Sequence, residues 1–177
     1  MFRRMGEIDH LRSVRFWLAI FITGLVLSGL TAFPLQREIR WTDATLHTSS
    51  LRAIASSIGL LGWIDEVYDG LTQTNGRYPF LAYGTDWLAF AHLVIAVAFI
   101  GPFMDPVRNK WVVTFGLIAC AGVIPLALIA GPIRGIPLGW RLIDCSFGVA
   151  GSIPLALCRR HILALEQETT TSVTLPT

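Results

Sequence analysis

Residues 131–144 read GPIRGIPLGWRLID and join two strongly apolar runs, residues 111–130 and 142–157. An α-helix of about 20 residues is about 30 Å long, which matches the hydrocarbon core of a bilayer. The two runs therefore predict two membrane-spanning helices joined by a short connection. A connection of this kind needs no charge, yet this one contains three charged residues.

Two further apolar runs complete a four-span arrangement. Residues 16–33 contain no charge, and residues 87–104 are interrupted only by His92. A cleaved signal peptide is the alternative for residues 16–33, but the run exceeds the usual apolar length of about 7–15 residues and ends in SGLTAFP, a poor cleavage site. The predicted fold is an all-α integral membrane bundle of four transmembrane helices, in a single membrane domain over residues 1–177.

Small residues spaced three or four apart indicate the faces on which these spans are expected to pack. They are Gly24 and Ser28 on the first span, Gly116 and Cys120 on the third, and Gly148, Gly151 and Ser152 on the fourth.

The composition agrees with a membrane protein and excludes other classes. The chain is 53% hydrophobic and 15% charged, which is too apolar for an ordinary soluble domain. The net charge is only +2 and basic residues occur singly or in pairs, so nucleic-acid binding has no electrostatic basis. Three cysteines without a CxxC pair and four scattered histidines without an HExxH motif match no recognised metal-ligand spacing, so no metal site is expected.

Residues 34–85 form the first external segment and are the most mixed part of the chain. A helix capped by Asp43 is expected first, followed by a second amphipathic helix with an apolar face from Leu60 to Leu71. Both are too interrupted to span, so we interpret them as one or two interfacial helices at the membrane surface or over the bundle mouth; a solvated loop is the alternative. At the end of the chain, residues 166–177 are expected to be a disordered tail.

The distribution of basic residues predicts the orientation of the spans. Of the 14 Lys and Arg residues, eight lie on the side that holds both termini and six on the other side. The eight are Arg3, Arg4, Arg12, Arg15, Arg108, Lys110, Arg159 and Arg160, and the six are Arg37, Arg40, Arg52, Arg77, Arg134 and Arg141. Both termini are therefore expected in the cytoplasm.

Five polar residues are expected to meet in the outer half of the bundle and form a candidate ligand-binding site: Arg134, Arg141, Asp144, His92 and Asp86. Arg141 and Asp144 are three residues apart and share a helix face. A charge at the centre of a membrane helix costs about 2.5–3.5 kcal/mol, so Asp144 needs a partner, either Arg141 or, across the turn, Arg134. An ion pair that only holds two helices together is the alternative interpretation.

His92 lies about five residues below Trp87, which places it roughly 7–8 Å into the membrane. An intramembrane ionisable side chain is a functional candidate by default. The alternative is a neutral histidine that donates to a carbonyl of a neighbouring helix. No cofactor is predicted, because haem bound through His92 would need a second axial ligand, for which His47 is the only candidate.

The chain contains no recognised catalytic motif. No serine lies in a GxSxG elbow and no glycine-rich phosphate loop follows a strand. The acidic residues Asp65, Glu66 and Asp69 could bind a cation, but such a run is more often the solvated side of a surface helix.

Residues 78–160 contain the phrases YPFLAYGTDWLAFAH, DPVRN, LIAGPIRGIPLGWRLIDCSFG and CRR. In these phrases the chain resembles a group of functionally uncharacterised bacterial multi-pass membrane proteins. The resemblance implies an integral protein of a bacterial inner membrane and assigns no catalytic residue.

The leading hypothesis is a non-enzymatic membrane protein that binds a small or lipidic ligand in a polar pocket at the outer half of the bundle. A structural accessory subunit that recruits a membrane-protein partner is the second hypothesis. The third is a membrane-embedded enzyme that uses His92 as acid or base with Asp86 or Asp144. The expected partners are the lipid bilayer and such a ligand or membrane protein, and no nucleic acid.

Overall fold

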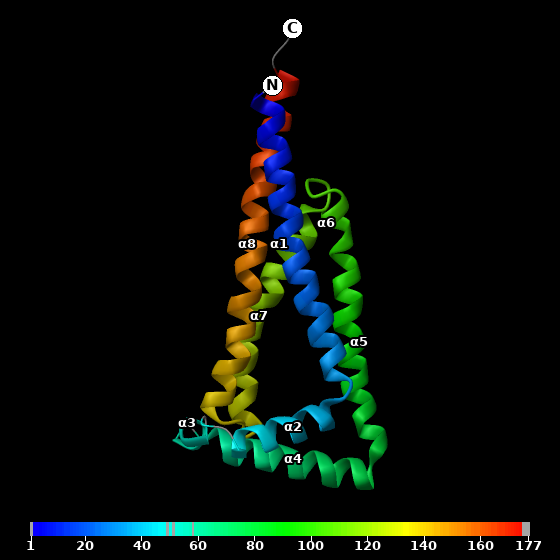
Figure 1. Ribbon diagram of the computed structural model, residues 1–177. Helices are drawn as coiled ribbons and strands as arrows, with labels where there is room; N and C mark the ends of the chain where they lie inside the picture. Colours follow the sequence, from blue (N-terminus) through cyan, green and yellow to red (C-terminus); the bar gives the residue numbers. More distant parts are fainter. Residues whose placement is uncertain (1, 49, 51, 58, 175–177) are drawn as a thin grey trace.

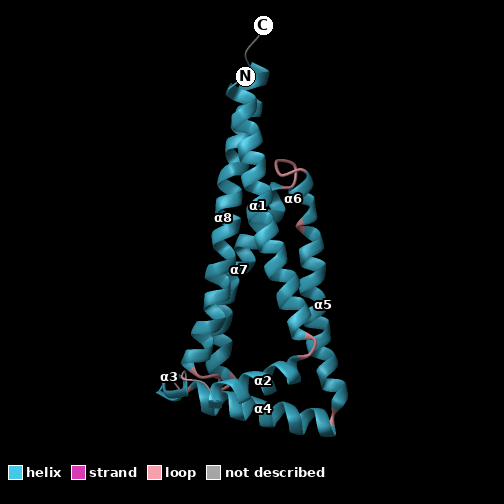
Figure 2. Cartoon of the chain, viewed as in Figure 1, coloured by secondary structure: helices cyan, strands magenta, loops and turns pink. Residues whose placement is uncertain are grey.

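The computed structural model describes residues 2–48, 50, 52–57 and 59–174. These residues form helices and turns and contain no strand (Figure 2). In chain order the helices are α1 (Phe2–Ala32), α2 (Leu35–Thr48), α3 (Arg52–Ser57), α4 (Leu60–Arg77), the short 3-10 helix η1 (Pro79–Ala82), α5 (Tyr83–Ala98), α6 (Ile100–Met104), α7 (Lys110–Ile133) and α8 (Leu138–Thr174). The predicted all-α fold class is confirmed.

Within the described chain, four helical stretches are long and apolar enough to cross a membrane. They are Ile8–Ala32 in α1, Pro79–Met104 across η1, α5 and α6, Lys110–Ile133 in α7, and Leu138–Glu168 in α8. Each overlaps one of the four predicted spans and is longer, because helical structure continues beyond the apolar run.

The long helices form two pairs that converge toward the chain termini. α1 packs on α5, α7 packs on α8, and α1 also packs on α8. Figure 1 shows α1 and α8 side by side where α1 begins and α8 ends, and shows the two pairs diverging toward the other end. We call this other end, opposite the termini, the distal end.

A buried core joins the two pairs nearer the termini. Its residues come from α1, α7, α8 and the junction of α5 with α6: Val14, Leu18, Phe99, Val113, Leu155, Cys158, Ile162 and Leu165. The ring of Phe99 also packs on Phe21, with the two ring centroids 4.7 Å apart. The distal end is therefore held by packing within each pair rather than by this common core.

Glycines allow the helices of each pair to approach closely. A Cβ added at Gly148 of α8 would lie 2.6 Å from the carbonyl oxygen of Cys120, so the predicted small faces of α7 and α8 are in contact. The prediction for α1 is wrong. Gly24 is exposed, with nothing within 4 Å of an added Cβ, while Gly29 faces α5, where an added Cβ would lie 2.9 Å from the Ala89 carbonyl oxygen.

The chain near both termini is helical. Residues 166–174, predicted as a disordered tail, continue α8 to Thr174, and α1 begins at Phe2. Each residue added to an existing helix forms one backbone hydrogen bond, so a polar sequence can continue the helix of a stable span. An ion pair anchors this extension, because Lys110 Nζ lies 2.7 Å from Glu166 Oε2. Residues 175–177 of the predicted tail lie outside the described residues.

α2 and α4 lie side by side across the distal end, with α3 between them in the chain (Figure 1). We call α2, α3 and α4 the distal layer. The amphipathic helices predicted between the first two spans are confirmed. α2 begins at Leu35, and Asp43 lies inside it rather than at its N-cap. The carbonyl of Pro34 accepts the first hydrogen bonds of α2, so the helix starts as soon as α1 has ended. The apolar faces bury Ile39 of α2 and Ile64 of α4.

Candidate functional site

Arg134 lies in the short connection between α7 and α8, and its side chain is exposed. Its backbone N–H donates to the carbonyls of Ala130 and Gly131, both at 3.1 Å, which ends α7. Gly135 then adopts a φ of 73°, the left-handed conformation that lets the chain reverse. Among the described residues, no side-chain hydrogen bond or ion pair involves Arg134. It is therefore a solvated cation at the distal end.

Arg141 and Asp144 do not form the expected ion pair. The side chain of Arg141 instead packs across Gly131 at the end of α7, where an added Cβ would collide with its Cγ and Cδ. The Nε of Arg141 is buried there without a hydrogen-bond partner within the described chain. Since Arg141 is turned toward α7, it does not run along the face of α8 toward Asp144.

Asp86 and His92 lie on α5, in the first turn and the middle of the helix. The Nδ1 of His92 lies 2.8 Å from the carbonyl oxygen of Leu88, so this nitrogen carries the proton and donates. The acceptor belongs to the same helix, whereas the alternative interpretation of His92 had an acceptor on a neighbouring helix. An added Cβ at Gly29 of α1 would lie 3.2 Å from the Cβ of His92, so His92 borders the contact between α1 and α5.

The five predicted site residues fall into two groups on different helix pairs. Asp86 and His92 belong to α5, which packs on α1. Arg134 follows the end of α7, and Arg141 and Asp144 belong to α8, which packs on α7. The two pairs diverge toward the distal end (Figure 1). Within the described ranges, no hydrogen bond or ion pair joins one group to the other. The two groups therefore lie on different helix pairs without a direct polar contact among the described residues, and a site shared by all five stays a prediction.

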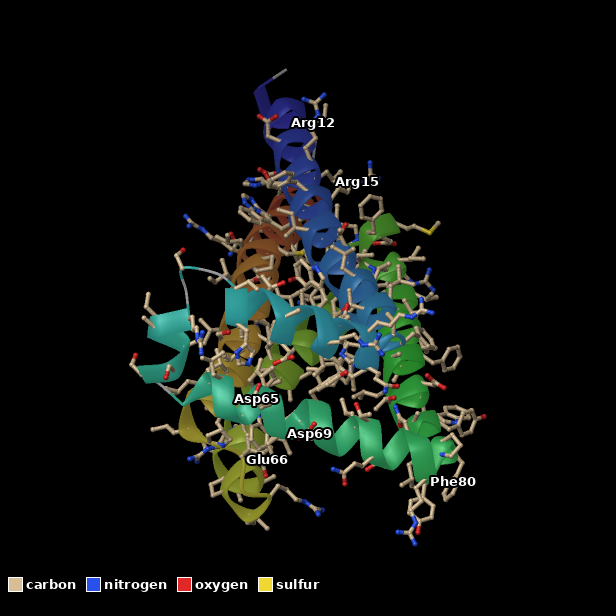
Figure 3. The ribbon with its side chains drawn as sticks, turned by 60° about the horizontal axis from the view of Figure 1, so that its bottom comes forward. Arg12, Arg15, Asp65, Glu66, Asp69 and Phe80 are labelled. Atoms are coloured by element: carbon tan, nitrogen blue, oxygen red, sulfur yellow. The ribbon has the colours of Figure 1, made fainter. Side chains whose placement is uncertain are left out.

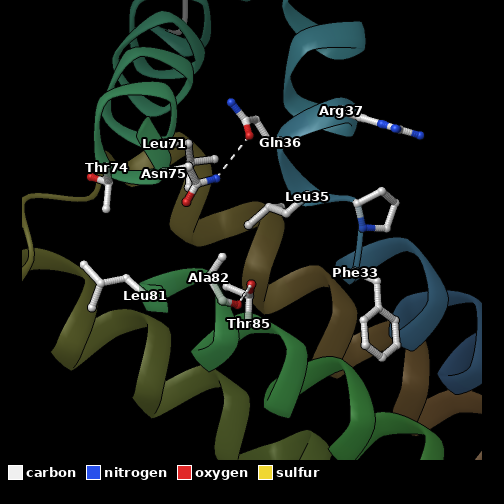
Figure 4. Close-up of a pocket in the computed structure, with 11 residues that line it drawn as sticks. Phe33, Leu35, Gln36, Arg37, Leu71, Thr74, Asn75, Leu81, Ala82 and Thr85 are labelled. Atoms are coloured by element: carbon white, nitrogen blue, oxygen red, sulfur yellow. Dashed lines mark hydrogen bonds between the residues drawn. The ribbon is translucent and has the colours of Figure 1, made fainter. Parts of the chain in front are cut away.

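A pocket of about 500 Å³ opens at the corner where α1 passes into α2. Its walls come from four segments: the end of α1 and start of α2, the last turns of α4, η1, and the first turn of α5 (Figure 4). The residues that line it are Phe33, Pro34, Leu35, Gln36, Arg37, Leu71, Thr74, Asn75, Leu81, Ala82 and Thr85. We call it the distal pocket.

The distal pocket combines an apolar wall with a polar rim. The Nδ2 of Asn75 donates to the Oε1 of Gln36 at 3.2 Å, which joins α4 to α2 at one side (Figure 4). Leu35 points toward the interior in this view, whereas Arg37 extends away from the Gln36–Asn75 pair on the exposed side of α2. None of the five predicted site residues lines this pocket, although Asp86 directly follows the lining residue Thr85.

A second group of polar side chains joins α2 to α4 at the other end of the distal layer. His47 Nε2 lies 2.9 Å from Asp65 Oδ1 and 3.3 Å from Asp43 Oδ1. One ligand atom from each of the three residues lies within 4.8 Å of the other two. Figure 3 shows Asp65 on α4 in this part of the layer. We call Asp43, His47 and Asp65 the layer triad.

The two carboxyl groups of the layer triad differ in their pKa. Burial and the neighbouring Asp65 raise the pKa of Asp43 above its ordinary value. The hydrogen bond from His47 lowers the pKa of Asp65, and the contact with Asp43 acts in the same direction. Asp65 therefore carries the negative charge more readily than Asp43. His47 lies on α2 and bonds to Asp65, whereas His92 lies on α5 and bonds to the Leu88 carbonyl oxygen.

The sequence contained a partial signal for the layer triad but none for the distal pocket. The spacing of Asp43 and His47, four residues apart, places both on one face of a helix, but Asp65 joins them only because α4 folds back along α2. The pocket had no sequence signal, because its walls come from four segments whose relative positions depend on packing.

Comparison of the chain with family models, curated proteins and solved structures finds no match.

Proposed function

We propose that this protein is a non-enzymatic membrane protein that binds a lipid-like amphiphile with an anionic head group in the distal pocket. The observation that supports this most directly is the pocket itself, whose volume of about 500 Å³ falls within the range of about 300–1,000 Å³ typical of ligand sites. The ligand class is the one expected from the sequence, whereas the residues that would bind it are different.

The chemistry of the pocket walls matches an amphiphile. Phe33, Leu35, Leu71 and Leu81 offer an apolar surface for an acyl chain. The amides of Gln36 and Asn75 and the hydroxyls of Thr74 and Thr85 offer hydrogen bonds to a polar head group. Arg37 at the exposed rim supplies a positive charge, and its long flexible side chain can approach a phosphate or carboxylate there.

The place of the pocket also supports a lipidic ligand. It lies where the span in α1 ends, the span that contains α5 begins, and the distal layer packs on both. In this proposal, that is the level where a lipid head group meets the acyl region. A molecule could therefore enter from the bilayer without crossing water. Arg134, Arg141 and Asp144 belong to the other helix pair and have no part in this binding.

The same proposal places the protein in a bacterial inner membrane with both termini in the cytoplasm. The excess of basic residues on the side of the termini supports this orientation. Arg12 and Arg15 lie on α1 far from the distal layer (Figure 3). A reporter fused after Thr177 should be active only in its cytoplasmic form, and activity of a periplasmic reporter there would refute the orientation.

Native mass spectrometry of the full chain in detergent tests the binding. We expect one bound lysophosphatidylglycerol at low micromolar lipid and weaker binding of zwitterionic lysophosphatidylcholine. Ala82→Trp fills the pocket and should abolish the one-to-one complex. Ala91→Trp places the same side chain at an exposed position of α5 outside the pocket and should retain it.

Arg37→Gln tests the role of charge at the rim. It should weaken binding of the anionic lipid by about 2–10-fold, the effect of an exposed ionic hydrogen bond worth about 0.5–1.5 kcal/mol. Arg40→Gln removes the same charge from the same helix at an exposed position outside the pocket and should have little effect. Equal binding by the wild type and the folded Ala82→Trp variant would overturn the proposal.

A further inference from the structure

The layer triad brings three potential metal ligands from two helices close together. Asp43 and His47 lie one turn apart on α2, and Asp65 comes from the adjacent α4. Two ligands four residues apart on one helix, completed by a third from another segment, is a common way to hold a metal ion. Carboxylate oxygen and imidazole nitrogen are both ligands of Zn²⁺, and three protein ligands leave a fourth position for water.

The one proton on His47 Nε2 cannot be donated to both carboxylates. The Nε2 of His47 has at most one hydrogen, and the 2.9 Å contact with Asp65 uses it. The Oδ1 of Asp43, 3.3 Å from the same nitrogen, is buried and has no hydrogen-bond partner within the described chain. An oxygen withdrawn from water and left without a donor is unfavourable in the free protein. A cation between the three donor atoms would bind this oxygen.

The charge around the triad also favours a cation. Within the part of the chain that the structure describes, the ion-pair partner of both Asp43 and Asp65 is His47, and neither pairs with a lysine or an arginine. Asp69, one turn beyond Asp65 on α4, adds a further negative charge that acts on Asp43. Even a protonated His47 leaves the cluster with an excess of negative charge, which a divalent ion would neutralise.

The geometry requires only small side-chain movements. Ligands about 2.0–2.2 Å from a tetrahedral zinc ion lie about 3.3–3.6 Å apart, and the three donor atoms already lie within 4.8 Å of one another. The side chains of His47 and Asp65 are 39% and 49% exposed, so they are free to rotate and an ion can reach them. The backbones of α2 and α4 need not move.

We propose that Asp43, His47 and Asp65 bind a divalent transition-metal cation, best matched by Zn²⁺, which clamps α2 to α4 in the distal layer. This inference is independent of ligand binding in the distal pocket, which lies at the other end of the same two helices. Because the ion would bind the folded arrangement and not the separated helices, its binding stabilises the layer.

The test uses the full chain in detergent, stripped with EDTA and then titrated with Co²⁺ as a spectroscopic substitute for Zn²⁺. We expect about one equivalent of Co²⁺ to bind with the intense visible absorption of a tetrahedral site, and Zn²⁺ to displace it. Zn²⁺ should also raise the unfolding temperature. His47→Gln and Asp65→Asn should each weaken binding at least tenfold, with helix content unchanged in circular dichroism.

Two variants control for charge and for a competing histidine pair. Glu66→Gln removes a carboxylate from an exposed position next to Asp65 and outside the triad (Figure 3). His161→Gln removes the partner of His10, whose Nδ1 lies 2.9 Å from the Nδ1 of His161 and could itself attract zinc. Both variants should bind like the wild type. If a triad variant does not fold, Asp43→Asn provides a further one, because it removes a carboxylate that lacks good hydrogen bonds.

The inference is overturned if the stripped wild type binds neither Co²⁺ nor Zn²⁺ saturably. It is also overturned if binding persists unchanged in folded His47→Gln and Asp65→Asn, which would place the metal elsewhere. Loss of lysophosphatidylglycerol binding without loss of metal binding would refute only the proposed function.

Discussion

The contact between α7 and α8 at Gly148 allows a sharp test of the packing. Gly148→Ala introduces a Cβ that would lie 2.6 Å from the carbonyl oxygen of Cys120 and 3.3 Å from the Cβ of Val123. The nearest obstacle is backbone rather than the end of a flexible side chain, so the two helices must separate or shift along each other.

The expected loss follows from two opposing effects. Overpacking a close contact costs about 1–3 kcal/mol, while replacing glycine by alanine inside a helix favours folding by up to about 1 kcal/mol. The net effect is a loss of about 1–2 kcal/mol. For a chain of this size, each kcal/mol lowers the unfolding temperature by about 2–4 °C, so we expect a decrease of about 2–8 °C.

Gly122→Ala is the matched control on α7, because nothing lies within 4 Å of a Cβ added there. It should leave the unfolding temperature unchanged or raise it slightly. Thermal unfolding in one detergent, followed by circular dichroism, compares the two variants directly. If Gly148→Ala is as stable as Gly122→Ala, then α7 and α8 do not approach closely at this point and the reasoning fails.

Three further predictions address the core, the ion pair near the termini and the layer triad. Leu18 is fully buried, so Leu18→Ala should cost about 2–5 kcal/mol and strongly reduce the yield of folded protein. Lys110→Gln removes the partly exposed ion pair with Glu166 and should cost at most about 1 kcal/mol, a difference that high salt abolishes. With EDTA present, Asp65→Asn should lower the unfolding temperature at neutral pH. The lowered pKa of Asp65 in the folded state stabilises the protein above the unfolded pKa, and this stabilisation is lost as the pH falls through the folded pKa. Asp43→Asn should raise the unfolding temperature at neutral pH and match the wild type in acid, because the stability from a raised folded pKa is present below the unfolded pKa and is lost as the pH rises. Unfolding curves between pH 3 and pH 8 would detect both effects. Equal shifts of the unfolding temperature in the same direction would contradict the opposite pKa shifts of Asp43 and Asp65.

Much of the fold could be predicted from the sequence because the signals are local. An apolar run of bilayer length forms a helix in a membrane, because its backbone groups must be hydrogen-bonded within the segment in lipid. The apolar face from Leu60 to Leu71 likewise predicted α4, whose bounds are Leu60–Arg77. The predicted start of the preceding helix at Asp43 was wrong, because α2 begins at Leu35, where the Pro34 carbonyl accepts the first hydrogen bonds.

Residue spacing alone did not indicate the correct partners. α1 has two small surfaces on different sides, one formed by Gly24 with Ser28 and the other by Gly29. Only the position of α5 decides that Gly29 is the one in contact. Arg141 and Asp144 share a helix face, but the end of α7 lies close enough to draw Arg141 across Gly131 instead. Whether a side chain contacts a residue three positions away or a residue on another helix depends on how the whole helices pack.

The sequence by itself determined that the chain is an all-α membrane bundle with an amphipathic segment between its first two spans, because hydropathy and periodicity act within one helix at a time. The tertiary structure alone decided which polar residues meet. It separated Asp86 and His92 from Arg141 and Asp144 by pairing α5 with α1 and α8 with α7. By folding α4 back along α2, it formed the distal pocket at one end of the layer and brought Asp43, His47 and Asp65 together at the other. Sites of this kind depend on distances between helices, which no single stretch of sequence specifies.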